Sequence, residues 1–379
     1  MRRARGMTLI EMMIVVALTS IIMMAAVATF SLMLNQRRRA ERILEVNNAI
    51  TIATSRLQFD LANAGFRFPA AAFAVRIINN VDTSTALKSS VGDITTTQNC
   101  GATSFGLVPG TDVIEISIGD ELATSVPTSF PTTSGNTFGF YVSSWNLIPP
   151  AIDQVVMVTN PAGDACIGRV TNFAGGTVTA DYLSPDFAGV DPSPSTTYPN
   201  CPGVLMNAYR LGRRVRYMVC QDPANANRSP GLYVQNAGPD GRFTGMPELA
   251  QDGVEDFQLA PRLLNVGSTI SGTGCTTIGG TSYCVCDDTT GPCSGVDGNG
   301  NAADSESTVI NAGSHEQWVR GLRFGITARG LRPTDPTSKA YRRPALFDHP
   351  AATAAEGDGF SRLTETRFVT FDNLTTVKP

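Results

Sequence analysis

Charged side chains are scarce in this sequence. Only 16% of its 379 residues are Asp, Glu, Lys or Arg, and the formal net charge is −4. Such a balance offers no basic surface for nucleic acid, so we expect no nucleic-acid partner. Histidine occurs only at His315 and His349, which leaves little material for histidine-based catalysis. Neither a nucleophile elbow nor a phosphate-binding loop is present, so the sequence does not indicate an enzyme and we expect no cofactor.

Glycine and proline, although common overall at 36 and 23 residues, are both absent from Met7 through Ala64. A continuous helix over that stretch would be ~87 Å long. No charged residue occurs in the 23 positions from Met12 through Leu34, more than the ~20 residues that a helix needs to cross the apolar core of a bilayer. Gly65 then predicts the end of the helix. We therefore expect a membrane helix over residues 7–34.

Arginines flank this apolar run on both sides, and three of them precede it, as in a secretory signal. A secretory signal has a shorter apolar stretch and a small-residue cleavage site, which are missing here, so a retained membrane segment is the better interpretation. Counting basic residues does not orient the helix, because they lie before and after it: Arg2, Arg3 and Arg5, then Arg37, Arg38, Arg39 and Arg42.

Residues 35–65 predict an amphipathic continuation of the same helix. Apolar residues recur there at intervals of three or four, which forms one stripe suited to packing against a sheet. The stripe consists of Ile43, Val46, Ile50, Ala53, Leu57, Leu61 and Ala64.

Residues 66–379 predict a β-rich head, because short apolar segments alternate there with loops rich in glycine, proline and threonine. Val215, Tyr217 and Val219 lie on one face of such a segment, and Leu322 and Phe324 lie on one face of another. The strand candidates are residues 112–118, 154–159, 177–183, 213–219, 318–326 and 367–371. The fold class is therefore α+β, with the long helix packed on an antiparallel sheet.

All eight cysteines lie in the head, which favours disulfides formed in an oxidising compartment such as the periplasm. They are Cys100, Cys166, Cys201, Cys220, Cys275, Cys284, Cys286 and Cys293. Eight cysteines allow about 105 pairings, so the connectivity stays open. The last four could instead form a zinc site, but the spacing of Cys284 and Cys286 does not suit zinc, and disulfides are the preferred interpretation.

A calcium loop is a second, weaker metal candidate. Oxygen-bearing side chains alternate at Asp297, Asn299, Asn301 and Asp304. The central glycine and the terminal glutamate of a calcium loop are missing, so a solvated polar loop is the preferred interpretation. Asp240, between Pro239 and Gly241, predicts a turn.

Glu11 stands out, because a carboxylate near the start of a membrane helix costs a few kcal/mol. Either it lies at the lipid–water boundary, where that cost is small, or it has a partner. The surrounding residues, Arg5-Gly6-Met7-Thr8-Leu9-Ile10-Glu11, resemble the class III leader of type IV prepilins. The resemblance implies that a prepilin peptidase removes residues 1–6, that it cuts between Gly6 and Met7, that Met7 is then methylated, and that Glu11 docks the subunit into a filament.

Four further stretches resemble the PilW-like minor pilins of type IV pili. They are residues 57–66, 252–259, 318–326 and 367–371. This resemblance implies a minor pilin that acts in initiation or at the tip of the pilus, with other minor pilins, the major pilin and a large tip adhesin as partners. It also implies an inner-membrane protein with a periplasmic head, which moves to the pilus tip or cell surface on assembly.

Two alternatives stay open at this point. The J-type pseudopilins of type II secretion have a similar layout, and a membrane-anchored periplasmic enzyme would use the helix only as an anchor.

Overall fold

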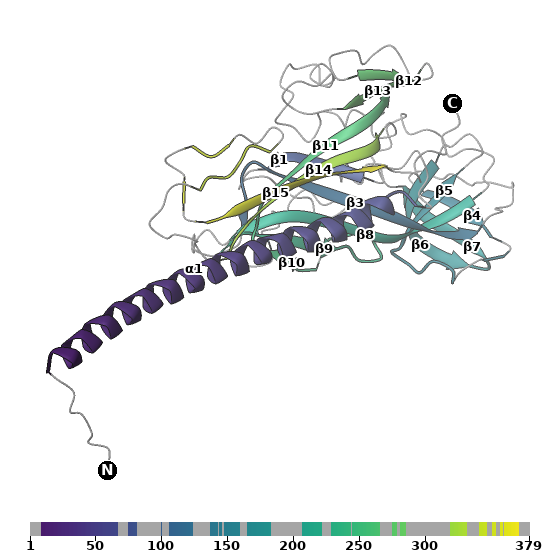
Figure 1. Ribbon diagram of the computed structural model, residues 1–379. Helices are drawn as coiled ribbons and strands as arrows, with labels where there is room; N and C mark the ends of the chain where they lie inside the picture. Colours follow the sequence, from purple (N-terminus) through teal and green to yellow (C-terminus); the bar gives the residue numbers. More distant parts are fainter. Residues whose placement is uncertain are drawn as a thin grey trace.

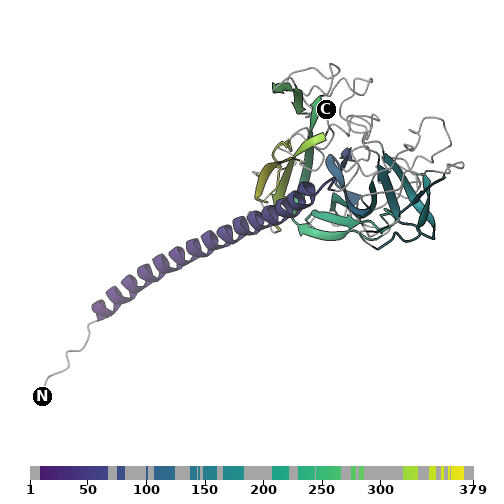
Figure 2. The ribbon, with the colours of Figure 1, turned by 90° about the vertical axis from the view of Figure 1, so that its right-hand side faces the viewer.

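The computed structural model describes most of the helix and much of the head. The described residues are 9–66, 75–81, 100, 106–123, 137–142, 144–145, 148–159, 165–182, 207–221, 229–243, 245–265, 275–278, 281–285, 319–331, 341–346, 351–353, 357–358 and 360–370. Figures 1 and 2 show one long helix that projects from a β-rich head, with the amino terminus at its far end.

Helix α1 runs without a break from Leu9 to Ala62, a total of 54 residues. This confirms the long helix that the absence of glycine and proline predicts. Gly65 has a φ of 72°, which is the left-handed conformation that ends many helices and suits glycine. Its N–H donates to the Ser117 carbonyl at 3.1 Å, and the Gly119 N–H donates to the Phe66 carbonyl at 2.9 Å. The helix end is thereby hydrogen-bonded to the head.

The amino-terminal part of α1 is uncovered, whereas its last third is packed. Among the described residues, α1 alone is long and apolar enough to cross a membrane, and its most apolar window is fully exposed. Packing against the head begins at Val46. The predicted stripe is correct from Val46 to Ala64 but wrong at Ile43, which is 50% exposed because it precedes the point where the head meets the helix.

The head contains fifteen described strands, and all their pairings are antiparallel. The strands are β1 (Val75–Val81), β2 (Gly106–Leu107), β3 (Thr111–Ala123), β4 (Thr137–Tyr141), β5 (Val155–Thr159), β6 (Ala165–Ala174), β7 (Thr177–Tyr182), β8 (Asn207–Gln221), β9 (Gly231–Asn236), β10 (Glu248–Asp252), β11 (Val254–Asn265), β12 (Cys275–Ile278), β13 (Thr281–Val285), β14 (Val319–Arg329) and β15 (Arg362–Thr370). The six predicted strands correspond to β3, β5, β7, β8, β14 and β15, so the antiparallel α+β prediction is confirmed.

The strands form two sheets rather than the one that the sequence predicted. The first sheet has ten strands, with the main order β1-β3-β8-β5-β6-β7-β4 and with β2, β9 and β10 joined through β8 and β9. The second has five strands in the order β12-β13-β11-β14-β15. In Figure 1, α1 passes along the head beside β14 and β15, with the β4–β7 region beyond its carboxyl end.

One apolar core joins the helix to both sheets. It includes Leu57 and Leu61 from α1, Tyr217 from β8, Phe257 from β11 and Phe324 from β14, all with no exposed surface. Burial of such side chains stabilises the fold by about 1.5–3 kcal/mol each. A separate core, which includes Phe138 and Phe140, fills the β4–β7 region. The last third of α1, from Val46 onward, is therefore an integral part of the head.

Candidate functional site

The predicted assembly segment lies at the free end of α1. Glu11 is in the first turn of the helix, and its side chain is exposed. A carboxylate there also interacts favourably with the helix dipole. Gly6 and Met7, the predicted processing residues, lie outside the described residues, so their roles remain predictions.

The hydroxyl groups within the apolar part of α1 are satisfied by the helix itself. Thr19 and Ser20 donate to the carbonyls of Val15 and Val16, at 2.6 and 2.8 Å. Thr29 and Ser31 donate in the same way to carbonyls one turn earlier. Because these hydroxyls have internal partners, the exposed helix can enter lipid, or pack against another apolar helix, without leaving them unpaired.

A polar cluster locks the carboxyl end of α1 to the first sheet. Asp60 has a side chain that is only 2% exposed and accepts two hydrogen bonds from the guanidinium of Arg213, at 2.6 and 3.2 Å. The buried Tyr217 hydroxyl donates a further hydrogen bond to the same carboxylate. Burial, together with this bond to Asp60, raises the pKa of Tyr217 well above its usual value. We call these three residues the helix latch.

The helix latch fixes the height and rotation of α1 relative to β8, because a bidentate arginine–carboxylate pair tolerates little displacement. A rigid helix then sets the distance from the latch to Glu11 at about 74 Å. The latch was not predicted from the sequence. The feature of the sequence that could have indicated it is the acidic residue Asp60, which lies beside the apolar stripe in a helix that packs against a sheet.

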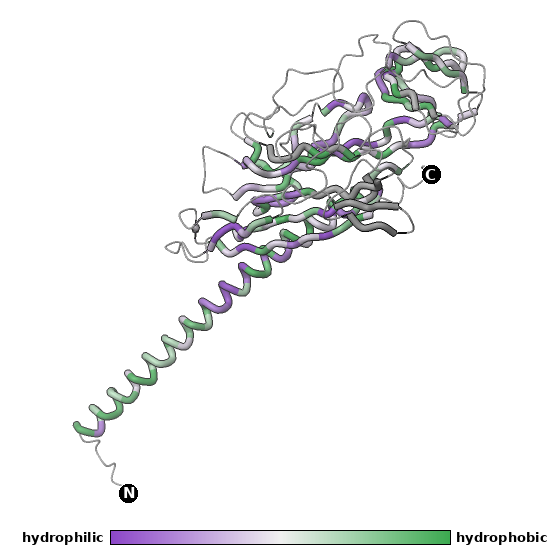
Figure 3. The backbone as a smooth tube through the Cα atoms, turned by 90° about the horizontal axis from the view of Figure 1, so that it is seen from above, coloured by the Kyte–Doolittle hydropathy of each residue, from purple (hydrophilic) through white to green (hydrophobic). Residues whose placement is uncertain are grey.

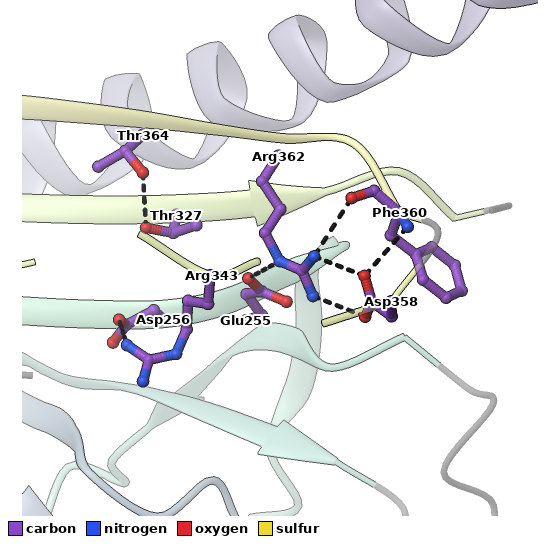
Figure 4. Close-up of polar contacts among 8 residues, drawn as sticks. All are labelled: Glu255, Asp256, Thr327, Arg343, Asp358, Phe360, Arg362 and Thr364. Carbon is purple, nitrogen blue, oxygen red and sulfur yellow. Dashed lines mark hydrogen bonds and ion pairs between the residues drawn. The ribbon is translucent and has the colours of Figure 1, made fainter. Parts of the chain in front are cut away.

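A second polar cluster holds the connection between β14 and β15 against β11 (Figure 4). Arg362 donates to Glu255 at 2.5 Å and binds both oxygens of Asp358, at 2.6 and 2.7 Å. Burial raises the pKa of Glu255, and the hydrogen bond and charge of Arg362 oppose that shift without cancelling it. The guanidinium of Arg329 lies 4.8 Å from the ring centre of Phe360.

A further ion pair anchors the same connection. Arg343 donates to Asp256 at 2.9 Å (Figure 4). Asp256 also accepts a hydrogen bond from Gln258 at 2.9 Å. We call the described residues 341–346, 351–353, 357–358 and 360 the strap. Leu346 of the strap lies over Gly325, where any side chain would collide with it. Asp256 of β11 thus holds the strap directly through Arg343. Glu255 of β11 holds it indirectly, through Arg362 of β15, which binds Asp358 of the strap.

The four stretches that resemble PilW-like pilins are neighbours in the structure. Residues 57–66 form the latched end of α1, 252–259 span the end of β10 and the start of β11, and 318–326 and 367–371 correspond to β14 and β15. Strand β14 pairs with both β11 and β15. Of these stretches, Trp318 and Phe371 lie outside the described residues. In the part of the chain that the structure describes, these stretches therefore lie at the joint between helix and head.

A third buried cluster stabilises the other face of β8. Glu115 accepts from Arg214 and Arg216, at 2.5 Å each, and both guanidinium groups lie over the ring of Phe243. Asp240 lies in the turn that precedes Phe243, where the Gly241 N–H donates to the Gly238 carbonyl at 2.9 Å. The turn predicted at Asp240 is confirmed.

Among the cysteines, Cys100 and Cys220 form a disulfide across 120 positions of the sequence. Cys275 and Cys284 are opposite one another in the pairing of β12 with β13, and Cys166 lies in β6, but the structure does not describe these three side chains. Cys201, Cys286 and Cys293 lie outside the described residues, as do Asp297, Asn299, Asn301 and Asp304. Within the described part of the chain, no group of three or more potential metal ligands occurs.

Comparison with known proteins supports the interpretation of the amino terminus. Residues 1–27 match the model of the prokaryotic N-terminal methylation motif. Among solved structures, the type IV-like pilin TTHA1219 from Thermus thermophilus is similar over 58% of this chain and 85% of its own, with 12% identity and a TM-score of 0.19. So low a TM-score does not establish a shared arrangement of the head. No curated protein sequence matches the chain. The chain thus carries a prepilin-type methylation motif at the start of an exposed apolar helix.

Proposed function

We propose that this protein is a minor pilin of a type IV pilus, which enters the filament through α1 and acts in initiation or at the tip. The observation that carries the proposal is the uncovered apolar helix behind a methylation motif, continuous with a helix that is latched into the head. A membrane-inserted subunit and a filament subunit both need such a surface, which lipid covers first and apolar helices of neighbouring subunits cover later.

Glu11 is the docking residue in this proposal. After cleavage between Gly6 and Met7, the new amino group of one subunit meets the carboxylate of another inside the apolar filament. Leaving one member of a buried pair alone costs about 3–5 kcal/mol, so the pair favours one axial register between subunits. The partners are the prepilin peptidase, other minor pilins, the major pilin and a large tip adhesin.

The size of the head supports a position at the tip. The described strands of the head form two sheets, and a head of this size is bulky for a subunit that repeats closely along a shaft. Its role is then carried by surfaces rather than by turnover of a substrate. Before assembly, the head lies in the periplasm and α1 lies in the inner membrane.

The test replaces Glu11 with alanine and uses Glu45→Ala, on the same helix but beyond the apolar segment, as the matched control. We expect Glu11→Ala to be processed and to reach the membrane in normal amounts, but to be absent from sheared pili. Glu45→Ala should enter pili normally. If Glu11→Ala entered pili as well as Glu45→Ala does, the docking role of Glu11 would be refuted.

Two further measurements test the rest of the proposal. Sequencing of the mature protein should give Met7 as its first residue, and a start at Met1 would refute the processing site. Deletion of the gene should abolish or reduce piliation. If it abolished protein secretion and left pili intact, the protein would be a pseudopilin of a secretion system instead.

A further inference from the structure

Four arginines surround α1 between its apolar segment and the head. We call Arg37, Arg38, Arg39 and Arg42 the arginine collar. The first three are exposed and Arg42 is half-buried. In Figure 3 the collar region is the hydrophilic stretch of the helix between its apolar part and the head. Neither membrane insertion nor Glu11 docking makes use of these charges.

The position of the arginine collar matches a bilayer surface. The apolar run of residues 12–34 is about 34 Å long as a helix, close to the ~30 Å of a bilayer core. Arg37 and Arg39 lie about 5 and 8 Å beyond Leu34 along the axis. A headgroup layer is about 5–8 Å thick on each side. These guanidinium groups therefore leave the apolar core at the depth of the lipid phosphates.

The charges of the arginine collar are only partly balanced within the helix. Arg37 pairs with Glu41 at 2.9 Å, and both side chains are well exposed. The interval 37–45 otherwise contains Glu45 as its only other acidic residue, which leaves two more positive than negative charges. Arg38 and Arg42 are four residues apart, a spacing at which like charges destabilise a helix. An external anion would relieve this repulsion.

The collar also faces the space beneath the head. Arg38, Arg42 and Val46 follow one another at intervals of four, so they lie on one side of the helix. Val46 is the first residue of α1 that packs against the head. The two arginines therefore continue the head-facing side of α1 toward the membrane, into the layer between the head and the bilayer surface.

We propose that the arginine collar binds the phosphodiester groups of anionic phospholipids in the leaflet that faces the head. The inference rests on the proposed membrane insertion of α1, but not on pilus assembly. Arginine suits this role because its planar guanidinium binds phosphate oxygens in a bidentate manner and stays charged. The contact holds the unassembled subunit at one depth, with Glu11 about 39 Å away near the opposite surface.

The test uses full-length protein in detergent micelles, titrated with phosphatidylglycerol or phosphatidylcholine, with bound lipids counted by native mass spectrometry. The variant is Arg38→Gln/Arg39→Gln. The matched control, Arg323→Gln/Arg342→Gln, removes the same charge from exposed positions of the head. Each basic residue near an anionic surface strengthens binding about fivefold. We expect the collar variant to lose about 25-fold of the preference for phosphatidylglycerol, and the control to keep it.

A second variant separates charge from geometry. Arg38→Lys/Arg39→Lys keeps both charges but loses the bidentate fork, so it should retain an intermediate preference. Equal binding of both lipids by the wild type would overturn the proposal, as would an unchanged preference in the glutamine variant. Loss of binding to another pilin with unchanged lipid preference would make the collar a protein contact, and would also overturn it. Entry into pili, measured separately, tests the proposed function.

Discussion

At the scale of single residues, the helix latch shows how one buried carboxylate joins two distant parts of the chain. Asp60 and Tyr217 are 157 positions apart in sequence, and their hydrogen bond is buried. A buried hydroxyl or carboxylate without a partner is costly, so each residue depends on the other. The latch therefore adds specificity to a joint whose apolar contacts alone would allow the helix to slide or turn.

We predict that Asp60→Ala destabilises the protein by about 1–3 kcal/mol, because it leaves the Tyr217 hydroxyl buried without an acceptor. The loss of the ion pair with Arg213 contributes less to this destabilisation, since the Arg213 side chain is 40% exposed and water can solvate it. Denaturant unfolding of the full chain in micelles measures the change. Gln58→Ala is the control, because its hydrogen bond to Arg367 is exposed and should matter by less than about 0.5 kcal/mol. If both variants lost the same free energy of unfolding, the stabilising role of the helix latch would be refuted.

At the scale of elements, the sequence predicted the helix and six strands but neither the second sheet nor the strap. Period and composition are local properties, and they identified β8 and β14 well. Which strands pair is decided by contacts between distant segments, such as β11 with β14. The prediction that the whole apolar stripe is buried was wrong at Ile43, because periodicity does not reveal where the head begins. The burial of Asp60 was not predicted, because the periodicity was counted over apolar side chains only.

The candidate site was predicted in part, for a similar reason. The leader motif and Glu11 are contiguous in sequence, so residues 1–11 could be interpreted without a structure, and the methylation motif there is confirmed. The cysteine pairing was different. The disulfide between Cys100 and Cys220 depends on the folding of β8 beside residue 100, which cysteine spacing does not encode.

The polar cluster around Arg362 leads to a prediction about the pH dependence of stability. The raised pKa of Glu255 means that the folded protein holds this proton more tightly than the unfolded chain. Its contribution to stability is therefore fully present below the unfolded carboxyl pKa of about 4.3, and is lost as the pH rises through the folded value. The unfolding free energy of the wild type relative to Glu255→Gln should thus fall as the pH rises above about 4.

Asp358 provides the matched contrast. Burial acts to raise its pKa, but hydrogen bonds from Arg362 and the Phe360 N–H outweigh burial and lower it. The wild type relative to Asp358→Asn should therefore gain stability as the pH rises above the lowered pKa. Denaturant unfolding at a series of pH values measures both slopes. Slopes of the same sign would mean that the cluster titrates in another way.

At the scale of the whole molecule, the disulfide closes a long loop of the first sheet. Cys100 and Cys220 are both buried, beside Leu107, Val113 and Met218. Closing so long a loop reduces the conformational freedom of the unfolded chain. Disulfides are favoured in oxidising compartments, which agrees with the proposed position of the head outside the cytoplasm.

We predict that Cys100→Ala/Cys220→Ala lowers the free energy of unfolding by about 2–4 kcal/mol. Part of that loss comes from the two missing sulfur atoms, since both side chains are buried. Wild-type protein unfolded in reductant keeps these atoms and should still lose most of the same free energy. If reductant had no effect on the wild type, the bond would not contribute to stability.

The length of free helix has one more consequence. Residues 9–45 extend about 55 Å before the head begins to pack against α1. Membrane helices tilt by about 20° on average, and a stiff rod of that length would carry its upper end sideways by about 20 Å. The free part of α1 thus converts a change of tilt into a sideways displacement of the head. In the proposed membrane-inserted state, small changes in the tilt of α1 would move the head over a large area of the bilayer surface, in which it can contact a partner.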